Sequence, residues 1–167
     1  RREIAVVVLA AGKGTRMKSA RAKVLHLLCG CPLLEHSLRV AEAMRPRKLV
    51  VVVGRDAEAV QAQFAGRAEF VLQAEQRGTG HAVLQCREAL RGFSGDVLIL
   101  YGDTPLLRRE TLERMAACKE QTRAELVLLT APVPLPGRIV RDAKGRVARI
   151  VEVTDATPEE LSIQEGN

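Results

Sequence analysis

The sequence contains no tryptophan, one tyrosine and three phenylalanines, so aromatic residues make up only 2% of its 167 residues. Proteins that stack many bases on aromatic side chains need more of them, which argues against a single-strand nucleic-acid binder. No run of lysine and arginine exceeds two residues, so a basic arm is also missing. The apolar run 4–11 is short, and no stretch approaches the roughly 18 apolar residues of a membrane span. We therefore expect neither a nucleic-acid partner nor a membrane partner.

The spacing of the cysteines does not suggest a metal site. The four cysteines are Cys29, Cys31, Cys86 and Cys118, and they form no paired C-x-x-C pattern. We expect four reduced thiols in a cytoplasmic protein. The balance of 47% apolar and 28% charged residues is typical of a globular domain, and the net charge of +6 suits anionic partners such as phosphorylated small molecules.

Apolar runs alternate with amphipathic segments along most of the chain. Continuous β-branched runs predict buried strands, and apolar spacing of three to four residues predicts helices. The expected strands are 4–11, 49–53, 69–73, 97–100 and 125–130, and the expected helices are 33–44, 57–64, 79–90 and 109–121. Segments 138–141 and 147–151 flank a turn-rich tetrapeptide and predict a β-hairpin. The fold class is therefore α/β, Rossmann-like, with a mostly parallel sheet flanked by helices and a hairpin insertion in the second half.

A glycine-rich segment follows the first predicted strand. Gly12 and Gly14 allow close backbone approach to an anion, and Lys13, Arg16 and Lys23 add positive charge. The segment meets neither the Walker pattern nor the dinucleotide G-x-G-x-x-G pattern. It indicates a phosphate site of another kind, the alternative being a plain tight turn.

A second polar segment follows the third predicted strand. Gln73 and Gln76 carry amides that can match the donor and acceptor edge of a base. Gly78 and Thr79 would let a helix start approach a ligand. The alternatives are a polar strand exit with a threonine cap and, for His81, a structural histidine.

A third segment ends the fourth predicted strand at Gly102 and Asp103. A carboxylate at the carboxyl end of a buried strand lies where α/β proteins bind ligands, and Mg²⁺ is often held by one or two carboxylates plus phosphates. Asp103 is therefore a candidate Mg²⁺ ligand, or else a helix-capping residue. Gly137, Glu152 and Asn167 are scattered polar positions that, taken alone, predict only turn or hairpin residues.

Three motifs together resemble one family. They are Leu-Ala-Ala-Gly-Lys-Gly-Thr-Arg-Met at 9–17, Gln-Ala-Glu-Gln-Arg-Gly-Thr-Gly-His-Ala at 73–82, and Tyr-Gly-Asp-Thr-Pro-Leu at 101–106. They look like those of the bacterial bifunctional N-acetylglucosamine-1-phosphate uridylyltransferases, and the likeness extends over 4–167. The resemblance implies transfer of UMP from UTP to N-acetylglucosamine 1-phosphate with Mg²⁺, in the synthesis of UDP-N-acetylglucosamine for peptidoglycan and the cell wall.

The resemblance also implies a role for particular residues. Those expected to bind the nucleotide are Leu9, Ala11, Gly12, Gln73, Gln76, Gly78 and Thr79. Arg16 and Lys23 are expected to hold the triphosphate and act in catalysis, and Asp103 to bind Mg²⁺. The amino sugar is expected to contact Gly137, Glu152 and Asn167.

The family pattern continues beyond this sequence. We expect residues 1–167 to be one nucleotidyltransferase domain that is incomplete at its C-terminus, without the β-helix acetyltransferase domain and without a second metal ligand, an Asn. The full-length protein would be a homotrimer. Three alternatives remain: a molybdopterin-guanylyl or methylerythritol-cytidylyl transferase, a nucleic-acid binder suggested by the basic charge, and a non-catalytic sugar-nucleotide sensor.

Overall fold

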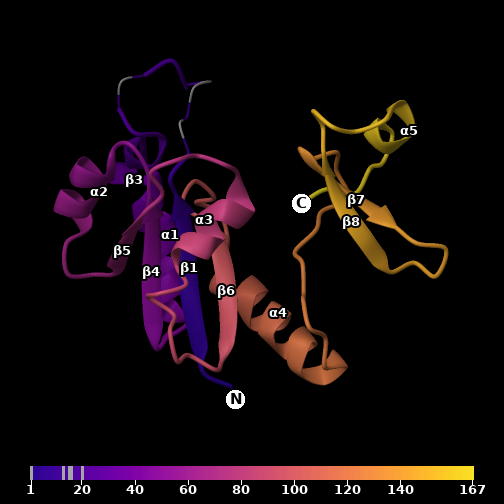
Figure 1. The fold of residues 1–167 in the computed structure, drawn as a ribbon, viewed down its shortest axis with the longest axis horizontal. Coiled ribbons are helices and arrows are strands. Elements are labelled where there is room, and N and C mark those ends of the chain that lie inside the picture. The colour runs from indigo at the N-terminus through magenta and orange to yellow at the C-terminus, as the bar shows by residue number, and fades with distance from the viewer. Residues whose placement is uncertain (1, 13, 15–16, 20) are drawn as a thin grey trace. The chain divides into compact units, whose positions relative to one another are not determined.

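The computed structural model describes residues 2–12, 14, 17–19 and 21–167, and the chain divides into two compact units, residues 1–112 and 113–167. The first unit contains a four-stranded sheet in the order β5-β4-β1-β6, in which every pair of neighbours is parallel (Figure 1). The second contains an antiparallel pair, β7 and β8. The expected fold class is thereby confirmed.

Most element bounds lie within one or two residues of those expected from the sequence. The strands of the first unit are β1 (Ile4–Ala10), β2 (Leu27–Leu28), β3 (Cys31–Pro32), β4 (Lys48–Val53), β5 (Glu69–Leu72) and β6 (Asp96–Tyr101). Its helices are the 3-10 turn η2 (Lys23–Leu25), α1 (Leu33–Ala43), α2 (Ala57–Phe64) and α3 (Thr79–Gln85), and α4 (Arg109–Thr122) runs across the unit boundary. The elements that follow are β7 (Gly137–Arg141), β8 (Val147–Glu152) and α5 (Pro158–Leu161). No helix formed by the described residues combines the length and apolar character needed to cross a membrane.

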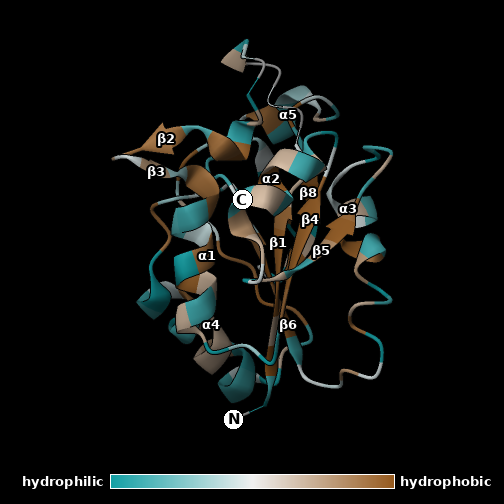
Figure 2. Ribbon diagram, turned by 90° about the vertical axis from the view of Figure 1, so that its left-hand side faces the viewer, coloured by the Kyte–Doolittle hydropathy of each residue, from teal (hydrophilic) through white to brown (hydrophobic). Residues whose placement is uncertain are grey.

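β1 and β4 are the interior strands of the sheet, and their β-branched side chains are buried on both of its faces. Val6 pairs with Leu49 of β4 on one side and with Leu98 of β6 on the other. Val6 to Val8 of β1 and Val50 to Val53 of β4 are fully buried. Figure 2 shows these strands as the hydrophobic centre of the first unit.

Helices α1 and α3 cover opposite faces of the sheet (Figures 1 and 2). α1 buries Leu34, Leu38 and Ala41 completely, in the spacing of one helix face, and it contacts β1 and β6. α3 contacts β1 and β4. Both helices therefore cover the strand whose carboxyl end carries the glycine-rich segment.

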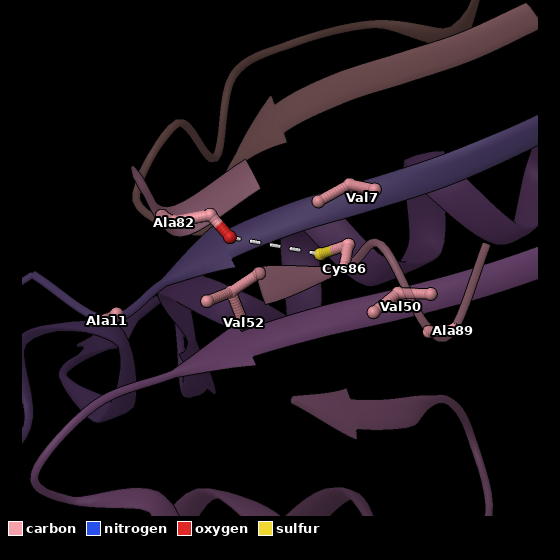
Figure 3. Close-up of a cluster of buried hydrophobic side chains, with 7 residues drawn as sticks. All are labelled: Val7, Ala11, Val50, Val52, Ala82, Cys86 and Ala89. Carbon is pink, nitrogen blue, oxygen red and sulfur yellow. Dashed lines mark hydrogen bonds between the residues drawn. The ribbon is translucent and has the colours of Figure 1, made fainter. Parts of the chain in front are cut away.

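The α3 face of the sheet is a small apolar cluster (Figure 3), made of Val7, Ala11, Val50, Val52, Ala82, Cys86 and Ala89. The Cys86 thiol lies inside it, with Sγ 4.0 Å from the Ala82 carbonyl oxygen. Burial, and to a lesser extent the charge of Glu69, raises the pKa of Cys86 to about 11. A thiol in this setting is a packing residue rather than a nucleophile.

The second unit is held by its hairpin and by contacts from the end of the chain. Ala131 and Gly166 form a two-way backbone bridge, with N–O distances of 2.9 and 3.0 Å. Thr157 and Glu160 form a capping box at the start of α5, the short helix opened by Pro158. The Ala131–Gly166 bridge and the neighbouring hydrogen bond from Thr130 to Glu165 each join residues that are 35 positions apart in the chain.

The strand expected at 125–130 is wrong. This segment forms no strand, and it contacts the end of the chain through polar groups: Asn167 Nδ2 donates to the Leu129 carbonyl oxygen at 2.8 Å, and Thr130 Oγ1 donates to Glu165 at 2.8 Å. Leu126 is 71% exposed, so the apolar run is not buried as a central strand would be. The apolar pattern reflects only the β-propensity of these residues, whereas a strand also needs a neighbouring strand for its backbone hydrogen bonds.

Three local features also differ from expectation. The helix expected at 79–90 ends at Gln85, because the chain continues in tighter turns, in which Cys86 N donates to Val83 O at 3.0 Å. Cys86 and Ala89 nevertheless pack in the apolar cluster. Asp56 precedes α2, but its side chain makes no cap hydrogen bond. The short hairpin of β2 and β3 was not expected, since its strands have only two residues each.

Candidate active site

The carboxyl ends of β1 and β6 open into a cavity of about 430 Å³, which we call the strand-end cavity. It is lined by Leu9, Ala10, Ala11, Gly12, Gly14, Met17, Lys23, Val24, Gln73, Gln76, Gly78, Thr79, Ala82, Tyr101 and Asp103. All of the described residues expected at the nucleotide, triphosphate and metal sites are among them. Arg16, also expected there, lies outside the described residues, as do residues 13 and 15.

Asp103 and Lys23 form an ion pair at the cavity wall. Lys23 comes from η2, and its Nζ donates to Asp103 Oδ2 across a separation of 80 residues in the chain. Both side chains are partly open to solvent, at 34% for Lys23 and 27% for Asp103. The carboxylate and the ammonium are thus accessible to a ligand that carries both phosphates and a cation.

The turn that carries Asp103 is held in place from three sides. Gly102 N donates to the Leu9 carbonyl oxygen at 2.9 Å, which continues the β1–β6 register past the strand ends. The Tyr101 carbonyl oxygen accepts from Ser37 of α1 at 3.0 Å and from Thr104 at 2.9 Å. Asp103 therefore follows a rigid strand end rather than a free loop.

Gln76 closes the side of the cavity next to β4. Its Nε2 donates to the Ala11 carbonyl oxygen, 65 residues away in the chain. Gly54, which directly follows β4, lies against the same carbonyl: a Cβ added there would be 2.7 Å from Ala11 O and 3.1 Å from Gln76 Nε2. Only glycine leaves room for this close approach.

Gln73 lies deeper, at 4% exposure. Its backbone N donates to Val53 O at 2.8 Å, which extends the β4–β5 register by one residue. Its side-chain Nε2 lies 3.2 Å from the Gly78 carbonyl oxygen and 3.0 Å from His81 Nδ1. Gly78 has a φ of +91°, a backbone conformation that L side chains rarely adopt, and it precedes α3 directly.

The three residues expected at the sugar come together in the second unit. Gly137 of β7 is the register partner of Glu152 of β8. Asn167 N donates to the Gly137 carbonyl oxygen at 2.8 Å, and a Cβ on Gly137 would be 3.1 Å from Asn167 O and 3.8 Å from Glu152 Oε1. The same Cβ would be 3.0 Å from Ile150 Cγ2, so glycine at this position allows β7, β8 and the chain end to pack closely.

Glu165 is the titratable group most strongly perturbed by its neighbours in that unit. Arg141 donates to it with two nitrogens, at 2.7 and 2.8 Å, and Thr130 donates a third hydrogen bond. These bonds, and the Arg141 charge, lower the pKa of Glu165 to about 2. Glu165 is therefore ionised at neutral pH, and its bonds to Arg141 connect β7 with the end of the chain.

The sequence analysis assigned no role to Gly54 or to the wall residues Val24 and Tyr101, although Tyr101 opens the third motif. Gly54 carried a signal, because it ends a buried strand that neighbours β1, as Gly12 and Gly102 end others. Within the described residues, no group of three or more His, Cys, Asp or Glu side chains is arranged to hold a metal ion. A metal at Asp103 would thus need further ligands from substrate or water.

A parallel α/β sheet with a glycine-rich segment, two amides and an ion pair at its strand ends defines a nucleotide-binding domain of the nucleotidyltransferase class. Residues 6–156 match the family described as MobA-like NTP transferase domain, and the chain belongs to that family. The expectation of a nucleotidyltransferase is therefore confirmed at the level of the family.

Solved structures of similar fold agree with this class. Rv0371c from Mycobacterium tuberculosis is 27% identical, with a TM-score of 0.60 over 72% of this chain and 62% of that one. A nucleotidyl transferase from Methanothermobacter thermautotroptrophicus is 26% identical, with a TM-score of 0.59 over 69% and 57% of the two chains. A second structure of Rv0371c, 24% identical over 71% of this chain and 60% of that one with a TM-score of 0.59, is a complex with manganese.

Similar curated proteins have the name "Bifunctional protein GlmU". The protein from Lactobacillus delbrueckii subsp. bulgaricus is 50% identical over 97% of this chain, that from Anaeromyxobacter dehalogenans 49% over 100%, and that from Pelobacter propionicus 50% over 98%. The chain spans 36–37% of the length of these relatives. They agree with the resemblance to bifunctional bacterial enzymes expected from the sequence.

Proposed function

We propose that this chain carries the uridylyltransferase site of an enzyme that makes UDP-N-acetylglucosamine and pyrophosphate from UTP and N-acetylglucosamine 1-phosphate. The observation that carries the proposal is the strand-end cavity, which brings together residues from three separate motifs, around Gly12, Gln76 and Asp103. The names of relatives about 50% identical support the same reaction.

The nucleotide would lie along the cavity with its base at the amides and its phosphates at the glycine-rich segment. In this proposal Leu9, Ala11 and Gly12 contact the uridine, with Gly78 and Thr79 beside the uracil. Gln73 and Gln76 read the base, because amides provide both donors and acceptors. Arg16 and Lys23 neutralise the triphosphate.

Asp103 would hold a divalent cation, which we take to be Mg²⁺. The donor set fits: one carboxylate, 27% exposed, stands at the cavity wall, and Mg²⁺ is commonly bound by one or two carboxylates with substrate phosphates and water completing the shell. Manganese in Rv0371c, a protein of similar fold, is compatible with a divalent cation. When bound, such a cation would neutralise phosphate charge and polarise the reacting phosphoryl group.

The reaction needs positioning and charge neutralisation more than acid–base chemistry. A phosphate oxygen of the sugar phosphate attacks the α-phosphorus of UTP in line, forming one P–O bond while the bond to the bridging oxygen breaks. Pyrophosphate leaves with the electron pair. Since the attacking oxygen is already ionised, no basic side chain is required. Lys23 and Arg16 would stabilise the charge that grows on the leaving pyrophosphate.

The second unit would supply the sugar contacts. We assign Gly137, Glu152 and Asn167 to the amino sugar because they meet in that unit and carry groups that can bind hydroxyl and amide functions. For the whole protein we propose a homotrimer in the cytoplasm whose product enters peptidoglycan and cell-wall synthesis, as the family resemblance implies.

The central test is pyrophosphate release by the full-length protein with UTP, N-acetylglucosamine 1-phosphate and Mg²⁺. Asp103→Asn should lose most turnover and need a higher Mg²⁺ concentration for half-maximal rate, because the ligand becomes neutral. Lys23→Met breaks the same ion pair but should lower the rate without changing the Mg²⁺ concentration that gives the half-maximal rate. If the wild type and Asp103→Asn reach half-maximal rate at the same Mg²⁺ concentration, Asp103 is not a metal ligand.

Nucleotide and acceptor panels separate the proposal from its alternatives. UTP should be used well ahead of CTP and GTP, and Gln76→Ala should narrow the difference, since a wrong base leaves polar groups unpaired at a cost of about 1–3 kcal/mol each. A preference for GTP or CTP would favour a cofactor guanylyl- or cytidylyltransferase. Binding of UDP-sugar without pyrophosphate release would indicate a sensor.

A further inference from the structure

His81, in the first turn of α3, lies between two glutamine amides. Its Nδ1 is 3.0 Å from Gln73 Nε2, and its Nε2 is 3.1 Å from Gln85 Nε2. The sequence alone left His81 as a structural histidine, and none of the roles proposed above uses it. Its ring contacts Gln73 directly, however, and Gln73 lines the strand-end cavity.

The orientation of the Gln73 amide follows from its second contact. The Gly78 carbonyl oxygen, 3.2 Å from Gln73 Nε2, can only accept a hydrogen bond, so the NH₂ group must face it. The second amide hydrogen then points to His81 Nδ1. Both donors of Gln73 are thereby used inside the protein, and among the described residues its Oε1 has no partner.

A neutral imidazole can accept at only one nitrogen, so His81 cannot accept from both glutamines. Gln73 is 4% exposed and anchored at Gly78, whereas Gln85 is only half-buried. The Gln85 amide also faces a carbonyl, that of His81 at 3.1 Å, so turning it in place would lose this bond and set two acceptor oxygens against each other. Because Gln85 is the more exposed of the two glutamines, its side chain is the one that can move away from that carbonyl. We therefore assign Nδ1 of His81 as the acceptor and its proton to Nε2, where the Gln85 oxygen can accept it once that side chain has moved.

We propose that His81 is the positioning residue that sets base choice, by holding the Gln73 amide so that only its acceptor oxygen faces the nucleotide. Uracil has a donor N–H at N3, which this oxygen can accept, whereas N3 of cytosine is itself an acceptor and would face it unpaired. This step rests on the proposed reading of the base by Gln73. Without the Nδ1 acceptor, the amide is free to turn and present NH₂ to the cavity, which would accommodate cytosine.

The kinetic test compares kcat/KM for UTP and CTP in variants of the full-length protein. His81→Phe keeps a ring but has no acceptor, and the UTP-over-CTP ratio should fall by about tenfold, the effect of one mispaired polar group. His81→Asn places an oxygen near the position of Nδ1 and should restore the ratio. Gln85→Ala is the matched control: it removes the other ring contact and should leave the ratio unchanged.

A merely structural role for His81 would lower kcat/KM for both nucleotides equally, and an unchanged ratio in His81→Phe would overturn the proposal. An equal fall of the UTP-over-CTP ratio in Gln85→Ala would also overturn it, because the contact at Nε2 would then matter as much as the proposed anchor at Nδ1. If the wild type does not prefer UTP, the proposed function fails instead.

A second measurement needs no turnover. Nitrogen chemical shifts of protein labelled with ¹⁵N-histidine distinguish the two neutral imidazole tautomers, and loss of a signal in His81→Asn assigns the ring. We expect an unprotonated Nδ1 and a protonated Nε2. The reverse tautomer would overturn the anchoring of Gln73 whichever nucleotide the enzyme uses.

Discussion

Gly54→Ala tests the contact between the end of β4 and the glycine-rich segment. The new Cβ would be 2.7 Å from the Ala11 carbonyl oxygen, and an ordinary contact of about 3.4 Å requires a shift of roughly 0.7 Å. The same oxygen accepts the Gln76 hydrogen bond, so movement that relieves the clash weakens that bond. Overpacking of this kind typically costs about 1–3 kcal/mol.

Two measurements test this cost. In a unit of 112 residues each kcal/mol lowers the melting temperature by about 4 °C, so Gly54→Ala should unfold at a clearly lower temperature than the wild type. The KM for UTP should rise, because Ala11 and Gln76 both line the strand-end cavity. The effect on KM separates a site contact from a general loss of packing.

Gly80→Ala provides the matched control. A Cβ at Gly80 would meet no atom within 4 Å, and its place in α3 means that alanine should stabilise the helix by about 0.5–1 kcal/mol. The two substitutions add the same methyl group to the same unit and should change the melting temperature in opposite directions. An unchanged melting temperature together with an unchanged KM in Gly54→Ala would refute the close approach of β4 to Ala11.

Three further predictions concern charge and reactivity. Arg16→Ala should lower kcat by about 10²–10³ and change the KM for UTP less, because the role proposed for Arg16 is to stabilise the charge that grows on the leaving pyrophosphate. Steady-state kinetics that show a pure KM effect would place Arg16 in substrate binding only. The pKa of Glu165 falls from 4.5 to about 2 on folding, so its stabilising contribution is complete above pH 4.5 and disappears as the pH falls toward 2. The free energies of unfolding of the wild type and Glu165→Gln should thus become equal at low pH. A difference between them that does not depend on pH would contradict the stabilising ion pair with Arg141. A thiol reagent should modify exposed Cys29 and Cys118 and spare buried Cys86 until the chain unfolds, as mass spectrometry of the labelled peptides can check.

Much of the fold was readable from the sequence because its cues are local. The β-branched runs around Val7 and Val51 predict strands buried on both faces, and the two are neighbours in the sheet. The spacing of Leu34, Leu38 and Ala41 predicts the buried face of α1. The same cues failed at 125–130, where the β-propensity is strong but no strand forms.

The candidate site was readable in part for the same reason. Glycines and polar residues directly after buried strands mark the edge where parallel strands end, so the sequence pattern already places Gly12, Gln73 and Asp103 at one edge of the sheet. The need for glycine at Gly54 was not readable, because it arises from a carbonyl 43 residues earlier in the chain, at Ala11.

The sequence by itself determined most of the order of strands and helices along the chain, the residues at the strand ends and the family, because propensity, periodicity and motifs are properties of neighbouring residues. Only the tertiary structure decided which groups become partners. Lys23 meets Asp103 across 80 residues, Gln76 meets Ala11 across 65, and the amide hydrogens of Gln73 are both consumed by Gly78 and His81. Hydrogen-bond partners and close contacts depend on distances that exist only once the strands have paired, so no local pattern encodes them.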